Sequence, residues 1–457
     1  MMEKFFNPKS VAIIGASHTP GKIGYSILEN FVSGGYKGEV YPVNPDTTPI
    51  LNKKVYPSLK QIPEKIDLVV IAVPAAFVPK VLKECIQKKI ESIIIISAGF
   101  SENGKNGKLL ENRCKKIISR TKTRVIGPNC IGVYDPYTAT DTLFLSRERL
   151  GRPKQGNIAF ITQSGAVGST ILDWLSEEKI GVSKFVSYGN AMDVNETDIL
   201  EFLSKDENTK VIVFYLEGVA SDGRKFIEIA KKTTMNKPVI ILKAGKTEKG
   251  TKAVVSHTGS LAGSAEIYSS VFKQSGVIEA GSWQELFDFA KIFSQPLPKG
   301  RKVAIVTDGG GFGVLAADEC ERQGLQLQEP NDELKDKLKK EMPSYVSLHN
   351  PIDLTGDANS DRYALAIEEC LKEYDAVVVI TLFQVPTLEE KVVDVIIDLS
   401  KKYKKPVLCC AAGGKFTKKL IAILEANSMP VYSTPEQAIK SLAVMVKYSE
   451  WLKKQGK

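Results

Sequence analysis

The stretch Val11-Ala12-Ile13-Ile14-Gly15 decides the fold, because it recurs twice in related form. The related runs are Ile158-Ala159-Phe160-Ile161-Thr162 and Val303-Ala304-Ile305-Val306-Thr307, so the three copies lie at nearly equal intervals. Each run is short and rich in β-branched residues, and each leads into small residues and then a helical pattern. This alternation predicts parallel sheets covered by helices, in three successive α/β units.

Two stretches rich in proline, glycine and lysine separate the units, at residues 152–156 and 295–300. The length of 457 residues agrees with roughly three domains of about 150 residues each. We therefore expect domains over residues 1–135, 150–295 and 299–457.

Composition excludes several classes of protein. The net charge of +9 comes from scattered residues, and the run Lys401-Lys402-Tyr403-Lys404-Lys405 predicts a solvated helix end, not a nucleic-acid site. Seven cysteines without a C-x-x-C spacing and only three histidines predict reduced thiols, a cytoplasmic protein and no metal site. We expect no signal peptide and no membrane span, since no long apolar run occurs.

The loop after the first strand is typical of a nucleotide site. It reads Gly15-Ala16-Ser17-His18-Thr19-Pro20-Gly21-Lys22-Ile23-Gly24, and its glycines let the backbone approach a phosphate at the start of a helix. The spacing is not G-x-G-x-x-G, and Val43-Asn44-Pro45 at the end of the second strand offers no acid to a ribose. NAD is therefore disfavoured, CoA remains open, and a plain glycine turn is the alternative.

Three further strand ends are expected to face the same crevice, because parallel strands place their ligand loops at one edge. In the third, Asn129 offers an amide to a ligand, while Cys130 is interpreted as a packed thiol because no histidine or lysine lies nearby to activate it. The three segments are Val73-Pro74-Ala75-Ala76, Ser97-Ala98-Gly99-Phe100 and Gly127-Pro128-Asn129-Cys130-Ile131-Gly132.

The second and third units each open with a predicted anion site. Bare N–H groups and the positive end of a helix bind anions where a strand, a loop of small residues and a helix follow one another. Glycines also serve packing at such places, so each motif alone is a weak signal. The motifs are Thr162-Gln163-Ser164-Gly165-Ala166-Val167-Gly168 and Thr307-Asp308-Gly309-Gly310-Gly311-Phe312-Gly313.

His257 is the candidate phosphoryl carrier. It lies in residues 245–264, a segment of small and hydroxyl residues that predicts an exposed loop. A surface histidine without function is the alternative. At pH 7 imidazole is largely neutral and nucleophilic, and the two helix starts would supply donors to a phosphate placed on it. Glu217, at the end of the strand Phe214-Tyr215-Leu216, is the best candidate to orient the ring.

Together these motifs resemble the α subunit of ADP-forming acetyl-CoA synthetase, a relative of succinyl-CoA synthetase. The resemblance runs along the whole chain and implies a CoA-binding Rossmann-like domain followed by two flavodoxin-like domains. It implies the reaction acyl-CoA + ADP + phosphate ⇌ acid + ATP + CoA, with acetyl-CoA or a similar small acyl-CoA. An acyl phosphate would form near Asn129, and His257 would take the phosphoryl group while Glu217 orients its ring.

The resemblance also implies a partner. No ATP-grasp pattern and no P-loop are found in the sequence, so we expect ADP, ATP and Mg²⁺ on a β subunit supplied in trans, in an α2β2 heterotetramer. Two alternatives stay open: a non-catalytic CoA-binding regulatory protein, and the ligase-like part of a protein acetyltransferase. His257 favours the enzyme over a CoA sensor, which has no need of it.

Overall fold

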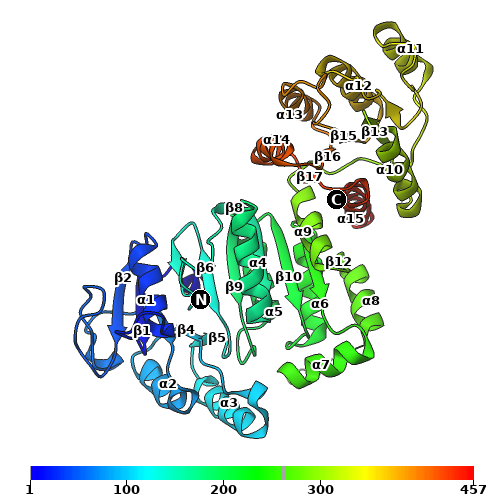
Figure 1. Cartoon of the computed structure of the whole chain (residues 1–457). Helices are drawn as coiled ribbons and strands as arrows, with labels where there is room; N and C mark the ends of the chain where they lie inside the picture. The colour runs from blue at the N-terminus through cyan, green and yellow to red at the C-terminus, as the bar shows by residue number, and fades with distance from the viewer. Residues whose placement is uncertain (1, 259–263) are drawn as a thin grey trace. The chain divides into compact units, whose positions relative to one another are not determined.

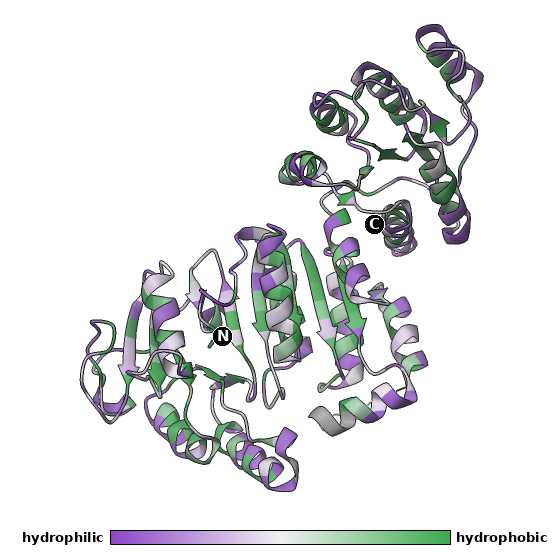
Figure 2. Ribbon diagram, in the orientation of Figure 1, coloured by the Kyte–Doolittle hydropathy of each residue, from purple (hydrophilic) through white to green (hydrophobic). Residues whose placement is uncertain are grey.

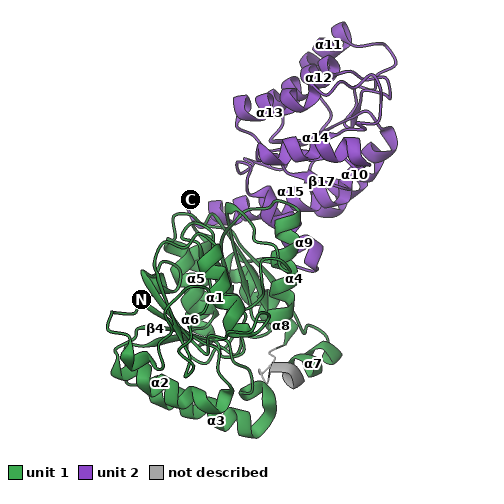
Figure 3. Cartoon of the chain, turned by 60° about the vertical axis from the view of Figure 1, so that its left-hand side comes forward, with its two compact units in different colours: residues 1–279 green, residues 280–457 purple. Residues whose placement is uncertain are grey.

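The computed structural model describes residues 2–258 and 264–457, without the side chains of residues 255–258. The chain forms two compact units, residues 1–279 and 280–457 (Figure 3). Within the described residues, no helix is both long and apolar enough to cross a membrane.

The first sheet of unit 1 is parallel and has the strand order β2-β1-β3-β4-β5 (Figure 1). The chain passes from β2 on one side of β1 to β3 on the other, and such a switch point opens a crevice at the carboxyl end of the strand. Its elements are η1 (Met2–Phe5), β1 (Ser10–Ile14), α1 (Ile23–Ser33), β2 (Glu39–Val43), η2 (Leu59–Gln61), β3 (Leu68–Ile71), η3 (Ala75–Phe77), α2 (Val78–Gln87), β4 (Ser92–Ile95), η4 (Ser101–Asn103), α3 (Gly104–Ile118) and β5 (Arg124–Ile126).

The second sheet of unit 1 has the order β12-β11-β10-β8-β9-β6-β7. Strands β6 and β7 follow β5 in the chain but join this second sheet, where β6 runs antiparallel to β9. They therefore connect the two sheets within one unit. The elements are β6 (Gly132–Asp135), β7 (Thr140–Asp141), β8 (Gln155–Thr162), α4 (Gly165–Glu177), β9 (Val182–Ser187), α5 (Glu196–Lys205), β10 (Val211–Leu216), α6 (Gly223–Thr234), β11 (Val239–Lys243), α7 (Glu248–Thr258), α8 (Ala265–Ser275) and β12 (Ile278–Ala280).

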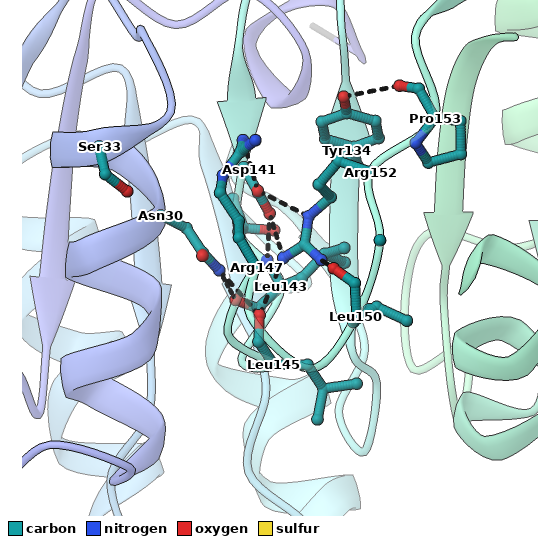
Figure 4. A network of polar contacts seen from close by, with 12 residues as sticks. Asn30, Ser33, Tyr134, Asp141, Leu143, Leu145, Arg147, Leu150, Arg152 and Pro153 are labelled. Atoms are coloured by element: carbon teal, nitrogen blue, oxygen red, sulfur yellow. Dashed lines mark hydrogen bonds and ion pairs between the residues drawn. The ribbon is translucent and has the colours of Figure 1, made fainter. Parts of the chain in front are cut away.

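A buried ion-pair network anchors the segment that leads from β7 to β8 (Figure 4). The fully buried Asp141 accepts hydrogen bonds from Arg147 at 2.9 Å and from Arg152 at 2.8 Å. Asn30 on α1 donates to the carbonyl oxygens of Leu143 and Leu145 at 2.7 and 3.1 Å. The segment is thus fixed to α1, the helix that follows the first strand.

Unit 2 holds a third parallel sheet, with the order β14-β13-β15-β16-β17. Strand β13 lies inside this sheet, as β8 lies inside the second sheet. The elements are α9 (Trp283–Ile292), β13 (Val303–Thr307), α10 (Gly310–Gln323), α11 (Asp332–Glu341), β14 (Ile352–Asp353), α12 (Ser360–Glu373), β15 (Ala376–Ile380), α13 (Val392–Tyr403), β16 (Val407–Cys410), α14 (Lys415–Ala426), β17 (Val431–Tyr432) and α15 (Pro435–Lys454).

The predicted α/β class is confirmed, and hydrophobic periodicity explains why it could be predicted. The strands are mostly apolar while the helices alternate apolar and polar residues (Figure 2), and every residue of β1, β3, β4 and β13 is buried. Burying a valine or isoleucine side chain stabilises the fold by about 1.5–3 kcal/mol. The three related runs of the sequence form β1, the end of β8, and β13.

The prediction of a loop over residues 245–264 is wrong for residues 248–258. The structure has helix α7 there, from Glu248 to Thr258, and α8 begins at Ala265. Glu248 pairs with Lys252 one turn later at 2.7 Å, and an acid in the first turn favours a helix. Val254 is buried and packs toward Gly245. These local interactions outweigh the high content of small residues. Residues 259–263 lie outside the described residues.

Candidate active site

The predicted CoA loop lies between β1 and α1, at the switch point of the first sheet. Gly15 has φ +92°, and a Cβ there would lie 2.6 Å from the carbonyl oxygen of Ala72. A Cβ on Gly24 would lie 1.9 Å from the carbonyl oxygen of Gly15. Around Gly21, by contrast, no atom lies within 4 Å of such a Cβ. The loop is therefore folded tightly at both ends and open in the middle, which fits a phosphate-bearing ligand.

The other predicted CoA-binding segments meet this loop at the same edge of the sheet. Asn44 donates to the carbonyl oxygen of Ala16 at 2.6 Å, and the Gly15 N–H donates to that of Val43 at 3.1 Å. On the other side of β1, Ser97 donates to the carbonyl oxygen of Val73. The carboxyl ends of β1, β2, β3 and β4 thus lie at one edge of the sheet, as the parallel order requires, and this edge is the predicted CoA crevice.

Asn129 meets a residue that sequence reasoning missed, Asn190 in the loop after β9. The Asn129 side-chain amide donates to Asn190 Oδ1 at 3.2 Å, and the Asn190 N–H donates to the carbonyl oxygen of Pro128 at 3.0 Å. Gly189 has φ +55°, and a Cβ there would lie 2.3 Å from the carbonyl oxygens of Pro128 and Asn129. The position of Gly189-Asn190 just after a strand was the available sequence signal.

Two carboxylates on the other side of Asn190 complete this cluster. Asn190 Nδ2 lies 2.6 Å from Glu102 Oε2, 2.9 Å from Glu111 Oε2 and 3.0 Å from Ser101 Oγ. Glu102 Oε1 also accepts the Gly99 N–H at 2.6 Å. Burial raises the pKa of Glu102, but hydrogen bonds from Asn190 and from backbone N–H groups outweigh it, so that its pKa is lowered overall.

The start of α4 is the predicted anion site of the second sheet. Ser164 caps the helix by accepting the Val167 N–H at 3.3 Å. The N–H groups of Gly165 and Ala166 lie in the first turn, where no intrahelical acceptor exists. A Cβ on Gly165 would meet only the side chain of Ile131, at 3.0 Å. A phosphate at this place would receive backbone N–H groups and the positive end of the helix dipole.

The side chain of Gln163 connects α4 to the Glu217 loop. Gln163 Oε1 accepts the N–H groups of Glu217 and Gly218, and its Nε2 donates to the carbonyl oxygen of Gly218 at 2.9 Å. Gln163 is buried, so its side-chain amide holds the backbone of the loop at Glu217 and Gly218 from the interior of the unit. The backbone N–H of Gln163 also bonds within the chain, to the carbonyl oxygen of Tyr215 at 3.3 Å.

Glu217 lies in a buried polar region at the end of β10. It is 4% exposed. Burial lowers the pKa of Lys243, and the negative charge of Glu217 offsets part of that effect. Burial and the same carboxylate raise the pKa of Tyr215 to about 12. Lys243 Nζ lies 4.6 Å from the ring centroid of Tyr268. These residues surround the carboxyl group of Glu217, which the sequence predicts to be the ring-orienting group.

His257 belongs to helix α7, but its side chain lies outside the described part of the structure. The Thr251 hydroxyl donates to the carbonyl oxygen of Gly245 at 2.9 Å, which ties the start of α7 to the end of β11. Helix α7 also contacts η4, the short helix that carries Ser101 and Glu102. The helix of the candidate phosphoryl carrier thus lies against the loop that borders Asn190 and the CoA crevice.

The second predicted phosphate site, at the start of α10 in unit 2, has acidic neighbours. Asp308 Oδ1 accepts the Leu382 N–H at 3.0 Å, and burial raises the pKa of Asp308 to about 6. A Cβ on Gly310 would lie 2.5 Å from Asp353 Oδ2. Gly309 and Gly310 therefore stand beside two carboxyl groups, while a Cβ on Gly311 would meet nothing within 4 Å.

The cysteines are structural. All seven are free and buried. Burial raises the pKa of Cys130 to about 12, which agrees with a packed thiol and not with a nucleophile.

Three family models match the chain in sequence. They describe a CoA binding domain over residues 9–136, a succinyl-CoA ligase like flavodoxin domain over residues 155–293, and a ligase-CoA domain over residues 303–455.

Relatives match over almost the whole chain. The α subunit of acetate–CoA ligase (ADP-forming) I from Pyrococcus furiosus is 43% identical and covers 98% of both chains. The 4-hydroxybutyrate–CoA ligase (ADP-forming) of Nitrosopumilus maritimus is 38% identical over 98% of this chain and 64% of its own length. A solved structure from Ca. Korarchaeum cryptofilum, a dinucleotide forming acetyl-coenzyme A synthetase 1 in complex with phosphate and ADP, superposes with a TM-score of 0.93. It is 37% identical, over 99% of this chain and 98% of that one.

Proposed function

The chain belongs to the family of ADP-forming acetate–CoA ligase α subunits, and on that premise we propose how its residues divide the reaction acyl-CoA + ADP + phosphate ⇌ acid + ATP + CoA. One observation carries the proposal: α7, the helix of His257, lies against η4 at the edge where the strand ends of the first sheet meet. A carrier histidine at that edge can reach a product formed in the CoA crevice.

The CoA crevice is assigned to the residues of four strand ends. The open middle of the glycine loop and the α1 start would hold phosphate groups, and the thiol of CoA would supply the leaving group of the reaction. The residues are Gly15, Ala16, Ser17, Gly21, Lys22, Gly24, Val43, Asn44, Pro45, Val73, Pro74, Ala98, Gly99 and Phe100.

The chemistry proceeds in two steps on this chain. Phosphate displaces CoA from the acyl group beside Asn129, forming an acyl phosphate and free CoA. A nitrogen of His257 then attacks the phosphorus, the P–O bond to the acyl group breaks, and the free acid leaves. Glu217 orients the ring and stabilises its charge. The phosphoryl group on His257 is bound by the α4 start at Gln163, Ser164, Gly165 and Ala166.

The last step, transfer from phosphohistidine to ADP, belongs to a partner. We assign it to an ATP-grasp β subunit that holds ADP and Mg²⁺, in an α2β2 assembly in the cytoplasm. The Nitrosopumilus maritimus relative supports this, because about a third of its length lies beyond the part that this chain matches. The α10 start, at Gly309, Gly310 and Gly311, is the second phosphate site on the route. The three domains are assigned to residues 1–135, 150–295 and 299–457.

Acetate, or a similarly small acid, is the proposed acyl group, as in the Pyrococcus furiosus relative. The two relatives named above are both acid–CoA ligases that match over 98% of this chain, so they do not favour the non-catalytic CoA sensor or the protein acetyltransferase.

Substituting Glu217→Gln tests the division of roles. It should slow the phosphorylation of the chain by acetyl phosphate by about 10²-fold, as for other positioned groups, and leave CoA affinity unchanged. The exposed Glu207 provides the control, since Glu207→Gln should change neither. Equal labelling in the Glu217→Gln variant would remove the assigned role. In parallel, calorimetric titration should show binding of CoA and none of NAD, and tight NAD binding would overturn the ligand.

A further inference from the structure

In the cluster around Asn190, the neighbouring groups determine which side-chain atoms donate hydrogen bonds and which accept them. Glu102 and Glu111 both lie within 3 Å of Asn190 Nδ2, and an ionised carboxylate can only accept hydrogen bonds. Among the described residues, neither glutamate forms an ion pair with a lysine or arginine. Backbone N–H groups of Gly99, Phe100 and Ser101 bond to Glu102 Oε1 and Glu111 Oε2, and the remaining Glu102 Oε2 faces Asn190. Asn190 must therefore turn its NH₂ group toward the glutamates, and its Oδ1 must face the other way.

The orientation of the Asn190 amide in turn determines the orientation of the Asn129 amide. Asn190 Oδ1 is an acceptor and lies 3.2 Å from the Asn129 amide, so Asn129 must present Nδ2 to it. One N–H of Asn129 is used in this bond, and the second N–H remains for a ligand. A carbonyl or phosphate oxygen needs such a donor, whereas the reversed amide would place an acceptor there and repel it.

We infer that Asn190 is a positioning residue, which transmits the orientation set by Glu102 and Glu111 to the amide of Asn129 at the acyl end of the site. This inference rests on the proposed function, because it specifies what Asn129 needs in order to bind the acyl phosphate. It goes further by assigning roles to Asn190, Glu102 and Glu111.

Packing alone does not explain the side chain. The loop of Asn190 is already held by its backbone, since the N–H groups of Asn190 and Met192 donate to the carbonyl oxygens of Pro128 and Gly127 at 3.0 and 3.1 Å. The cluster also borders the chemistry, because η4 carries Ser101 and Glu102 and contacts α7. The side chain of Asn190 is thus free to serve orientation.

Asn190→Asp is the decisive substitution, since it keeps the shape and removes the donor. The assay is the rate at which acetyl-CoA and [³²P]phosphate label the purified chain. We expect the rate at pH 7.5 to fall by about 10–100-fold, as for a misplaced substrate contact, with CoA affinity within about twofold of wild type by calorimetry. The rate should rise again as the pH is lowered, because a protonated carboxyl can donate to Glu102 or Glu111 while still accepting from Asn129.

A second substitution should restore a hydrogen-bond donor between positions 102 and 190. Adding Glu102→Gln to Asn190→Asp gives position 102 an amide donor while its oxygen still accepts the Gly99 N–H, and the double variant should recover about tenfold or more of the rate. Asn195→Asp is the matched control, because Asn195 caps α5 in the same loop and aspartate caps equally well. Its rate should match wild type.

The outcomes separate the two claims. If the wild-type chain takes up no label, the proposed function fails, whatever Asn190 does. If the wild type is labelled and Asn190→Asp is labelled equally fast with the same pH profile, the positioning role is wrong and the function stands. A slow Asn190→Asp variant that neither low pH nor Glu102→Gln restores would also contradict the orientation argument.

Discussion

The starts of α4 and α10 share a strand–loop–helix construction, and the side chain just before the helix cap differs in charge between them. In each, a threonine ends the strand and its hydroxyl bonds to both the N–H and the carbonyl oxygen of the residue two positions on, Thr162 with Ser164 and Thr307 with Gly309. In each, the residue between them accepts backbone N–H groups from the loop after the neighbouring central strand. That residue is Gln163 before α4 and Asp308 before α10.

The difference lies in charge. Gln163 is neutral and also donates to Gly218, so the start of α4 keeps its positive potential. Asp308 is a buried carboxyl group, whose pKa burial raises to about 6, and near neutral pH it places negative charge beside the start of α10. The same sequence pattern therefore gives a helix start beside a neutral amide in unit 1 and one beside a titratable carboxyl group in unit 2, so an anion should be bound more readily at the first.

Introducing a negative charge at Gln163, before α4, should have the largest effect on stability and labelling. Gln163→Glu places a carboxylate against the carbonyl oxygen of Gly218 and beside Glu217, so we expect a loss of about 2–4 kcal/mol in stability. Labelling by acetyl phosphate should fall by about 10²-fold, because the helix start loses its positive potential. Thermal unfolding and the labelling rate measure the two effects. Gln155→Glu, at the exposed start of β8, should alter neither, and a fully active Gln163→Glu chain would contradict the comparison.

The reverse exchange at α10 should change the pH dependence of stability. The pKa of Asp308 is raised in the folded state, so its carboxyl costs stability as the pH rises from about 4 through about 6. Asp308→Asn should remove this loss, on the order of 3 kcal/mol at pH 7. Calorimetric melting at pH 4.5 to 7 measures it, against Asp318→Asn on the exposed side of α10. A difference between wild type and Asp308→Asn that stays constant over this range would mean that the burial of Asp308 costs nothing.

The smallest effect is expected at the cap of α4. Ser164→Ala removes the bond to the Val167 N–H and should cost about 1 kcal/mol, with a several-fold loss of labelling because Ser164 belongs to the proposed phosphate site. Ser282→Ala removes the corresponding cap of α9. It should cost similar stability and leave labelling intact. Equal labelling in both variants would show that the Ser164 hydroxyl serves the helix alone.

The sequence predicted those parts of the molecule that rest on local pattern. The runs at Val11, Ile158 and Val303 form buried strands because β-branched residues fit a covered sheet, and parallel order then places their loops at one edge. Asn190 could not be found in this way. Its contact with Asn129 depends on β6 pairing antiparallel with β9, which no spacing within the sequence reveals.

Two further features depended on interactions rather than composition. Helix α7 forms in a segment of small residues because Glu248 pairs with Lys252 and Val254 is buried. The pKa of Asp308 depends on how completely its strand end is covered. Sequence patterns indicate neither the depth of burial nor the charges that meet there.

The central claim, that His257 carries the phosphoryl group, is tested most directly by locating the label. The purified chain is incubated with acetyl [³²P]phosphate, and the phosphate is mapped to a peptide. We predict one acid-labile, base-stable phosphate on the peptide that contains His257, and none in a His257→Ala chain of unchanged CoA affinity. A His257→Ala chain that is still fully labelled would contradict the account.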